Sequence, residues 1–183
     1  KTSMQEDQRN QLLKIIGDSK LVLRTGIVLM HFLRTADIYW RLVEIERAKV
    51  NWHTGDKMNI IQRSDEITVI ASHKLLSGIR EAAGSDELLA EWSNLALVTV
   101  DYPTDANYTP GTLSFIAGQL DSINVNIVAI YNTLTKISFV ISEQDAAKAY
   151  DRLSGSFAEC KKAAEKAGET KLEEQPKEQG TEK

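Results

Sequence analysis

Nine apolar residues between positions 113 and 141 recur at alternating spacings of three and four, and this regularity constrains the fold more than any other feature. Such spacing places the residues on one stripe of an α-helix and is typical of a helix that packs lengthwise against other helices. Thr109 suits the cap of this helix and Pro110 suits its first turn. We therefore predict a long helix over residues 109–142, whose buried seam consists of Leu113, Ile116, Leu120, Ile123, Ile127, Ile130, Leu134, Ile137 and Ile141.

Apolar residues at helical spacing also occupy much of the remaining chain. They predict helices over residues 3–52, 57–83 and 145–167, a turn at 53–56 and a short helix at 85–97. Residues 98–111 contain turn-forming residues and are expected to form an irregular loop. The predicted fold class is all-α: an antiparallel bundle of about four long helices with coiled-coil seams. The short helix and the loop would lie between the second and fourth helices.

A change of composition near residue 168 predicts the domain boundary. Residues 1–168 carry the apolar stripes of the helical bundle domain, whereas residues 169–183 consist almost wholly of Glu, Lys, Gln, Thr and Gly. Such a segment cannot bury enough apolar surface to offset the entropy lost on ordering, so we expect a disordered charged tail. No internal repeat is apparent in the sequence.

The charge and the absence of known motifs argue against several classes of function. A net charge of -4 is unfavourable for binding nucleic acid, which usually requires a basic surface. The single cysteine, Cys160, excludes a multi-cysteine metal site, and the three histidines form no Glu-x-x-His or His-x-x-x-His pair. Glycine-rich nucleotide-binding motifs and the nucleophile-elbow motif do not occur. We therefore predict no catalytic, cofactor-binding or metal-binding residues, no cofactor and no enzyme activity.

The predicted helix over 109–142 carries an unusual second face. From residue 113 to residue 142 only Asp121 and Lys136 are charged, although a helix facing solvent normally carries many charges. Either this helix lies at the centre of the bundle, or its second face contacts another protein or a second copy of the chain. The aromatic residues around the irregular segment either pack over the bundle or form a recognition loop. The candidate partner-binding residues are Phe115, Val125, Val128, Phe139, Trp92, Tyr102 and Tyr108.

These observations favour a non-catalytic interaction module that binds another protein or self-associates. A sensor bundle that holds a small ligand in an apolar pocket is one alternative, and an enzyme whose site is assembled from distant polar residues is another. The sequence begins at Lys1 and has a hydrophilic tail, which favours an extracytoplasmic or membrane-tethered domain. The longest apolar stretch, residues 25–33, is too short to span a bilayer. Attachment to a membrane would therefore require an N-terminal anchor that has been removed.

Overall fold

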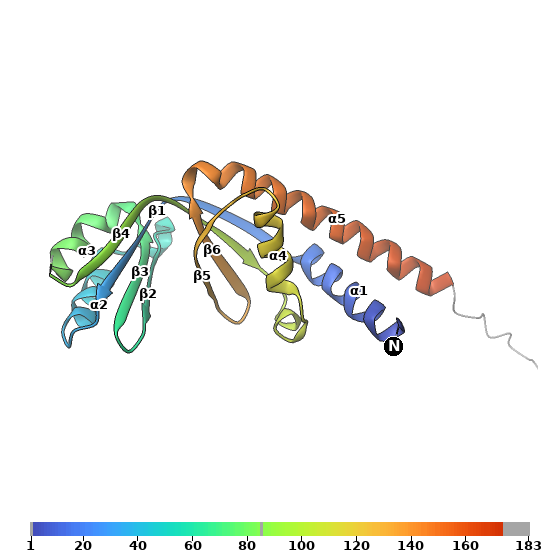
Figure 1. The fold of residues 1–183 in the computed structure, drawn as a ribbon, viewed down its shortest axis with the longest axis horizontal. Helices are drawn as coiled ribbons and strands as arrows, with labels where there is room; N and C mark the ends of the chain where they lie inside the picture. Colours follow the sequence, from blue (N-terminus) through green and yellow to red (C-terminus); the bar gives the residue numbers. More distant parts are fainter. Residues whose placement is uncertain (1, 85, 174–183) are drawn as a thin grey trace, which may run out of the picture. The chain divides into compact units, whose positions relative to one another are not determined.

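The computed structural model describes residues 2–84 and 86–173, and it combines helices with a six-stranded sheet (Figure 1). The strands lie in the order β2-β3-β1-β4-β6-β5, and β3 pairs antiparallel with both β1 and β2. In chain order the elements are α1 (Thr2–Asp18), β1 (Lys20–Leu33), α2 (Ile38–Lys49), η1 (Trp52–Thr54), β2 (Met58–Gln62), β3 (Glu66–Ser72), η2 (His73–Leu75), α3 (Leu76–Ala83), β4 (Leu88–Asp101), η3 (Thr104–Tyr108), α4 (Thr112–Asp121), β5 (Ile127–Asn132), β6 (Lys136–Ser142), η4 (Glu143–Asp145) and α5 (Ala146–Glu173).

The prediction of an all-α helical bundle with coiled-coil seams is wrong. The expected helix over 109–142 is α4 followed by the hairpin of β5 and β6, and the expected short helix at 85–97 is most of β4. The expected first helix, 3–52, divides into α1, β1 and α2, and the second, 57–83, divides into β2, β3 and α3. A helix close to the predicted position is present only at α5. It ends at Glu173, and residues 174–183 of the expected disordered tail lie outside the described residues.

The residues of the predicted seam explain this error. From residue 123 onward the seam is rich in isoleucine, and the positions between its members hold further valine and threonine. These β-branched side chains are restricted in a helix and pack well on a sheet. In the structure Ile127 is half-buried, whereas Ile130 is 45% exposed, as expected for residues on opposite faces of β5. Strand β6 is buried at five successive positions, so its apolar run shows no alternation that would distinguish it from a buried helix.

The chain divides into two compact units that share the two long strands. Unit 2 comprises Leu23–Leu97 and Val140–Ala146, and unit 1 comprises Lys1–Val22, Val98–Phe139 and Ala147–Lys183. Unit 2 therefore contains most of β1, then α2, β2, β3, α3 and the first part of β4. Unit 1 contains the end of β4, then α4, β5, the first part of β6 and α5, together with α1 and the start of β1, whereas the end of β6 and η4 belong to unit 2. The predicted boundary at residue 168, between a folded domain and a tail, stays a prediction.

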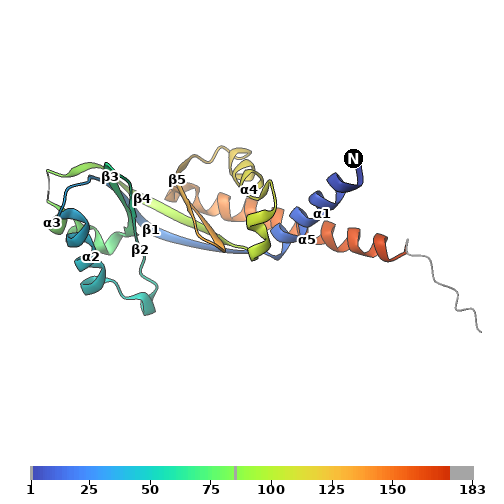
Figure 2. The same ribbon diagram turned by 90° about the horizontal axis from the view of Figure 1, so that it is seen from below.

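The core of unit 2 lies between its strands and the helices α2 and α3, which lie beside each other (Figure 2). Alternate residues of β1 enter this core and belong to the same cluster of buried side chains as Ile38 of α2 and Ile79 of α3. Burial of these apolar side chains is the main force that holds the helices on the strands. The alternate residues of β1 are Val28, Met30 and Phe32.

The two units repeat the same local structure, although the sequence showed no repeat. In the hairpin of unit 2 the Arg63 amide donates to the Glu66 carbonyl at 2.9 Å, and in that of unit 1 the Thr133 amide donates to the Lys136 carbonyl at 2.7 Å. Each hairpin leads through a serine with an extended backbone into a short 3-10 turn and then a helix. For these serines, Ser72 and Ser142, φ is -63° in both cases and ψ is 136° and 137°. Units 1 and 2 therefore have the same order of strands and helices.

The shared strands carry another repeated feature, a single residue with a left-handed backbone. Gly26 in β1 has φ +66° and Asn94 in β4 has φ +55°. Glycine and asparagine adopt this conformation more readily than other residues, which accounts for the residue types at these two positions. A side chain at Gly26 would meet nothing within 4 Å, so the backbone angle rather than space favours glycine there.

Among residues 2–84 and 86–173, no helix is both long enough and apolar enough to cross a membrane.

One buried carboxylate holds the turn that precedes β2. Asp56 pairs with the Lys74 ammonium at 2.7 Å and accepts a hydrogen bond from the Asn51 amide at 2.8 Å. The hydrogen bond from Lys74 is the main reason why the pKa of the Asp56 carboxyl lies below its usual value of 3.8, and the Asn51 amide adds to the effect. The charged carboxylate therefore stabilises the fold, because the ionised form is favoured in the folded state.

We predict that Asp56→Asn lowers the melting temperature at neutral pH. The folded-state pKa is depressed, so the stabilisation by Asp56 is present above the unfolded-state value and is lost as the pH falls through the folded-state value. The difference in melting temperature between the wild type and Asp56→Asn should therefore shrink below pH 3.8. Thermal denaturation followed by circular dichroism over a pH series measures this difference. A difference that stays constant down to acid pH would contradict the assignment.

Candidate functional site

The candidate partner-binding residues do not share one face in the structure. The four residues expected on one helix face are divided among α4, the segment after it, β5 and β6. Phe139 is fully buried and Val125 is buried, whereas Val128 is exposed and Phe115 is half-buried. Their role in binding a partner stays a prediction, but they do not form the continuous surface from which it was inferred.

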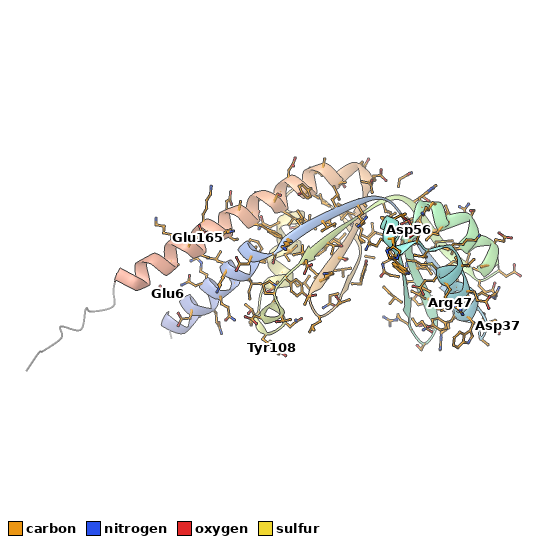
Figure 3. The ribbon with its side chains drawn as sticks, turned by 180° about the vertical axis from the view of Figure 1, so that it is seen from behind. Glu6, Asp37, Arg47, Asp56, Tyr108 and Glu165 are labelled. Carbon is orange, nitrogen blue, oxygen red and sulfur yellow. The ribbon has the colours of Figure 1, made fainter. Side chains whose placement is uncertain are left out.

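The three aromatic candidates also differ in their surroundings. Tyr102 is only 7% exposed, and its hydroxyl donates to the Thr133 carbonyl at 3.4 Å. Tyr108 is 88% exposed and projects from η3 (Figure 3). Trp92 lies on β4 with its ring edge-on to that of His31, at 5.5 Å between centroids. Tyr108 and Trp92, which is 45% exposed, are open to solvent, whereas Tyr102 is buried.

A cleft of about 420 Å³ opens in unit 2 at the start of α2. Its wall is formed by the segment that links β1 to α2, by the first turn of α2 and by the end of β2. The backbone of the linking segment is fixed, because the Arg34 amide donates to the Asp65 carbonyl in the β2–β3 turn at 3.0 Å. The lining residues are Arg34, Thr35, Ala36, Tyr39, Trp40 and Gln62.

The start of a helix and an arginine meet at this cleft. The first amides of any α-helix have no acceptor within the helix, and the helix dipole makes this end positive. In α2 the first amide with a carbonyl partner is that of Arg41, which donates to Asp37 at 3.1 Å. Asp37 stands at the cap position (Figure 3), but its side chain accepts no hydrogen bond from these amides. Arg34 is exposed and forms no ion pair within the described part of the chain. The start of α2 and Arg34 therefore favour an anionic group.

Thr35 supplies a polar group that lacks a partner. Its Oγ1 atom is shielded from solvent, yet it makes no hydrogen bond to any described residue. A shielded hydroxyl without a partner costs about 1–3 kcal/mol, so such groups are rare unless another molecule completes their bonding. Because Thr35 also lines the cleft, a rotation about its Cα–Cβ bond would turn this hydroxyl toward a polar atom of a ligand there.

Two aromatic side chains form the apolar part of the cleft. Trp40 is 65% exposed, and its ring meets that of Tyr39 at 5.2 Å between centroids with an interplanar angle of 64°. Exposed tryptophan is costly in water and is common where a ligand or partner covers it. The cleft thus joins a cationic end to an aromatic wall, a combination that suits a small molecule with one anionic and one apolar part.

Other hollows in the two units offer less to a ligand. The cleft of about 550 Å³ beside η2 is lined by Lys74 and Arg80, but Lys74 is paired with Asp56 and Arg80 with Glu91. The groove of about 500 Å³ between α1 and α5 is a gap between helix side chains that widens away from Gly17, where the two helices are closest. No group of three His, Cys, Asp or Glu side chains arranged to hold a metal ion occurs within residues 2–84 and 86–173.

The residues that line the cleft were missed at the level of sequence. Arg34 and Tyr39 were placed within one long helix, whose charges at 34–49 looked like the exposed face of a helix. A usable signal was present, because a nine-residue apolar run ends at Leu33 and is followed by Arg-Thr-Ala-Asp, which resembles a strand end and a helix cap. This would have placed Arg34 and Thr35 in a connecting loop, where functional residues are common.

Comparisons with known proteins identify the fold. No family model matches the sequence, and none of the curated protein sequences matches it. Among solved structures, the regulatory subunit of aspartate kinase from Thermus thermophilus, in a ligand-free form, matches 75% of this chain and 96% of its own, with 16% identity and a TM-score of 0.58. The chain therefore has the same fold as this subunit. At this level of identity the likeness shows the fold alone.

Two complete kinases contain the same fold as a part of their length. Aspartate kinase from Clostridium acetobutylicum, described as an allosteric enzyme, matches 75% of this chain and 34% of its own, with 16% identity and a TM-score of 0.59. Aspartokinase III from E. coli, in complex with lysine and aspartate in the T-state, matches 75% of this chain and 32% of its own, with 14% identity and a TM-score of 0.51. This chain thus spans about a third of each kinase.

We predict that Thr35→Val does not destabilise the free protein. The substitution replaces a shielded hydroxyl that has no partner with a methyl group of similar size, so the free energy of unfolding should stay equal or rise by about 1 kcal/mol. The matched control is Thr68→Val, because the Thr68 hydroxyl contacts His31 Nδ1 at 2.9 Å and its loss should lower stability by about 1 kcal/mol. Urea denaturation measures both values. A fall for Thr35→Val as large as that for the control would show that the Thr35 hydroxyl is bonded.

Proposed function

We propose that the chain is a regulatory module that binds a small ligand in the cleft at the start of α2. One observation carries the proposal. The unpaired Arg34, the first amides of α2 and the shielded Thr35 hydroxyl lie at one cleft, beside the aromatic rings of Tyr39 and Trp40. The ligand-sensor alternative thus replaces partner-protein binding as the preferred function. The sequence analysis expected the ligand pocket of a helical bundle. The pocket that we propose lies between the start of α2 and the end of β2.

The chemistry of the cleft favours an amino acid or a similar small carboxylate. Arg34 and the first amides of α2 would hold the carboxylate, and the Thr35 hydroxyl would accept from an amino group. Tyr39 and Trp40 would cover the apolar part of the ligand. The structure of E. coli aspartokinase III with lysine and aspartate supports this choice, because that kinase contains the same fold. The allosteric description of the Clostridium acetobutylicum enzyme supports a regulatory role.

We also propose that the module itself is not an enzyme. The cleft lining contains no histidine, cysteine or carboxylate that could act as a nucleophile or as a general base. Burial raises the pKa of the Cys160 thiol, and the nearby Glu159 raises it further, so this cysteine is not activated as a nucleophile. A ligand bound in the cleft would be held and not transformed.

The carboxylate proposal predicts that an amino acid raises the melting temperature and that the effect depends on Arg34. A ligand that binds only the folded state stabilises it in proportion to the logarithm of its concentration above Kd. Thermal melting in the presence of each of the twenty protein amino acids, with glycerol as a neutral control, should identify one or a few that stabilise the protein. Arg34→Gln should then weaken the affinity about tenfold to hundredfold, because a charged hydrogen bond is lost.

The matched control for Arg34 is Arg47→Gln. Arg47 is exposed on the last turn of the same helix, far along α2 from the cleft (Figure 3). This variant should bind with the wild-type affinity, as measured by isothermal titration calorimetry. Equal losses in the two variants would indicate a general effect of charge and not a site at Arg34. If no amino acid stabilises the wild type, the proposed ligand class is wrong.

Self-association through β5 is a second candidate function, because β5 is an edge strand with unusual composition. It ends the sheet, contains no charged residue, and exposes Val128 at 37% and Ile130 at 45%. Exposed apolar edges without charge or proline tend to pair with another strand. Two copies of β5 can pair with each other antiparallel about a two-fold axis, which closes the assembly at a dimer.

We predict a dimer in solution that Ile130→Lys dissociates. A lysine on the edge strand would place two like charges close together across the interface. Light scattering should give a mass of about twice 20.4 kDa for the wild type and about 20.4 kDa for the variant. Val22→Lys is the control, since Val22 is similarly exposed, at 44%, but lies on β1 and not on β5. A monomeric wild type would remove this candidate.

A further inference from the structure

The internal repeat gives the ligand cleft of unit 2 a counterpart in unit 1. Corresponding positions are fixed by equivalent hydrogen bonds: the Arg34 amide donates to Asp65 at 3.0 Å, and the Tyr102 amide donates to Thr135 at 2.9 Å. Counting on from these bonds and from those of the hairpins, four residues that line the cleft have counterparts in unit 1. In order, the counterparts of Arg34, Thr35, Ala36 and Gln62 are Tyr102, Pro103, Thr104 and Asn132. Tyr39 and Trp40 lie in α2, and unit 1 forms η3 before its own helix α4, so the counting stops there.

The polar groups that favour an anion in unit 2 are absent from this counterpart. Tyr102 replaces the exposed arginine, and its hydroxyl is used by the Thr133 carbonyl. Pro103 replaces the threonine, so the shielded hydroxyl is missing as well. Where α2 begins with free amides, unit 1 forms η3, in which the Ala106 amide already donates to the Pro103 carbonyl at 3.0 Å. The counterpart therefore offers neither the cation nor the shielded hydroxyl.

A side chain of unit 1 also closes the gap in which a ligand would lie. In unit 2 the cleft separates the start of α2 from the end of β2. In unit 1 the side-chain amide of Asn107, in η3, donates to the Thr104 carbonyl at 3.0 Å and to the Leu134 carbonyl in the β5–β6 turn. Asn107 thus ties η3 to the hairpin across the equivalent gap. Ala106 beside it is only 6% exposed.

We propose that unit 1 contains a closed counterpart of the ligand site, held shut by Asn107, so that each chain binds a single ligand and binds it in unit 2. The number of ligands rests on the proposed function, whereas the closure does not. The chain then has an open ligand cleft in unit 2 and a closed copy of it in unit 1. Removing the Asn107 bridge should loosen η3 without creating a second site, because the cation and the hydroxyl would still be missing.

A thiol-labelling experiment tests the closure without any ligand. In a Cys160→Ala background, Ala106→Cys places a thiol beneath η3, and Ala36→Cys places one at the exposed turn of the open cleft. The thiol at 106 should react with a small disulfide reagent much more slowly than the thiol at 36. Adding Asn107→Ala should speed the reaction at 106 about tenfold, because the bridge that keeps the segment closed is lost.

Equal labelling rates at 36 and 106 would overturn the closed site, as would a rate at 106 that Asn107→Ala leaves unchanged. If Ala106→Cys fails to fold, amide hydrogen exchange of residues 104–108 in the wild type and in Asn107→Ala replaces it. Exchange in this segment should be about tenfold faster in the variant, and unchanged exchange would overturn the proposal in the same way.

Calorimetry with the amino acid that most stabilises the protein tests the number of sites. We expect one ligand per chain, and Arg34→Gln should weaken the binding at this single site about tenfold to hundredfold. Two ligands per chain in the wild type would overturn the single-site proposal. So would an Arg34→Gln variant in which half of the sites keep the wild-type affinity. If no amino acid binds, the proposed function fails, and the labelling rates alone then decide whether the counterpart is closed.

Discussion

The structure depends on the pairing of β1 and β4, two fourteen-residue strands that lie next to each other in the sheet and take part in both units. Pairing with a neighbour satisfies the backbone hydrogen bonds of these strands, and a buried amide or carbonyl without a partner would be costly. Each also passes through one left-handed residue, Gly26 or Asn94. Around these strands the same order of helices and strands is built twice. The cleft of unit 2 lies where β1 ends, and its closed counterpart lies where β4 ends.

The sequence predicted the existence of a packed core but not its type. Apolar residues on one helix stripe recur at spacings of three and four. The same spacings can occur by chance in strands, as for Ile127 and Ile130, which lie on opposite faces of β5. What separates the two cases is the type of side chain. Leu113 to Leu120 does lie in α4, whereas the isoleucine-rich and valine-rich part from Ile127 onward forms strands. Strands β1, β3 and β6 are buried over runs of three to five residues, which removes the alternation that reveals a strand.

The site was less accessible to prediction than the core, for a different reason. Arg34, Thr35 and Gln62 become neighbours only because β2, β3 and β1 lie side by side, and this order depends on pairings between distant segments. Tyr102 illustrates the reverse case, since an aromatic residue in a proline-rich segment looked like a recognition residue and is instead buried with its hydroxyl bonded. The internal repeat was equally hidden. The hairpins share backbone hydrogen bonds and serine angles, while most of their side chains differ.

The order in which the chain is threaded through its two units has a consequence for biosynthesis. Most of unit 2 is a continuous stretch, Leu23–Leu97, so its strands and helices leave the ribosome together and can pair early. Unit 1 contains both α1 and α5, so it stays incomplete until the C-terminal helix has been made. A nascent chain that stops before residue 139 therefore has a nearly complete unit 2 and an unfinished unit 1. Truncation at the end of β4 would leave α1 without α4 and α5, and the apolar side chains of α1 would be open to chaperones and proteases.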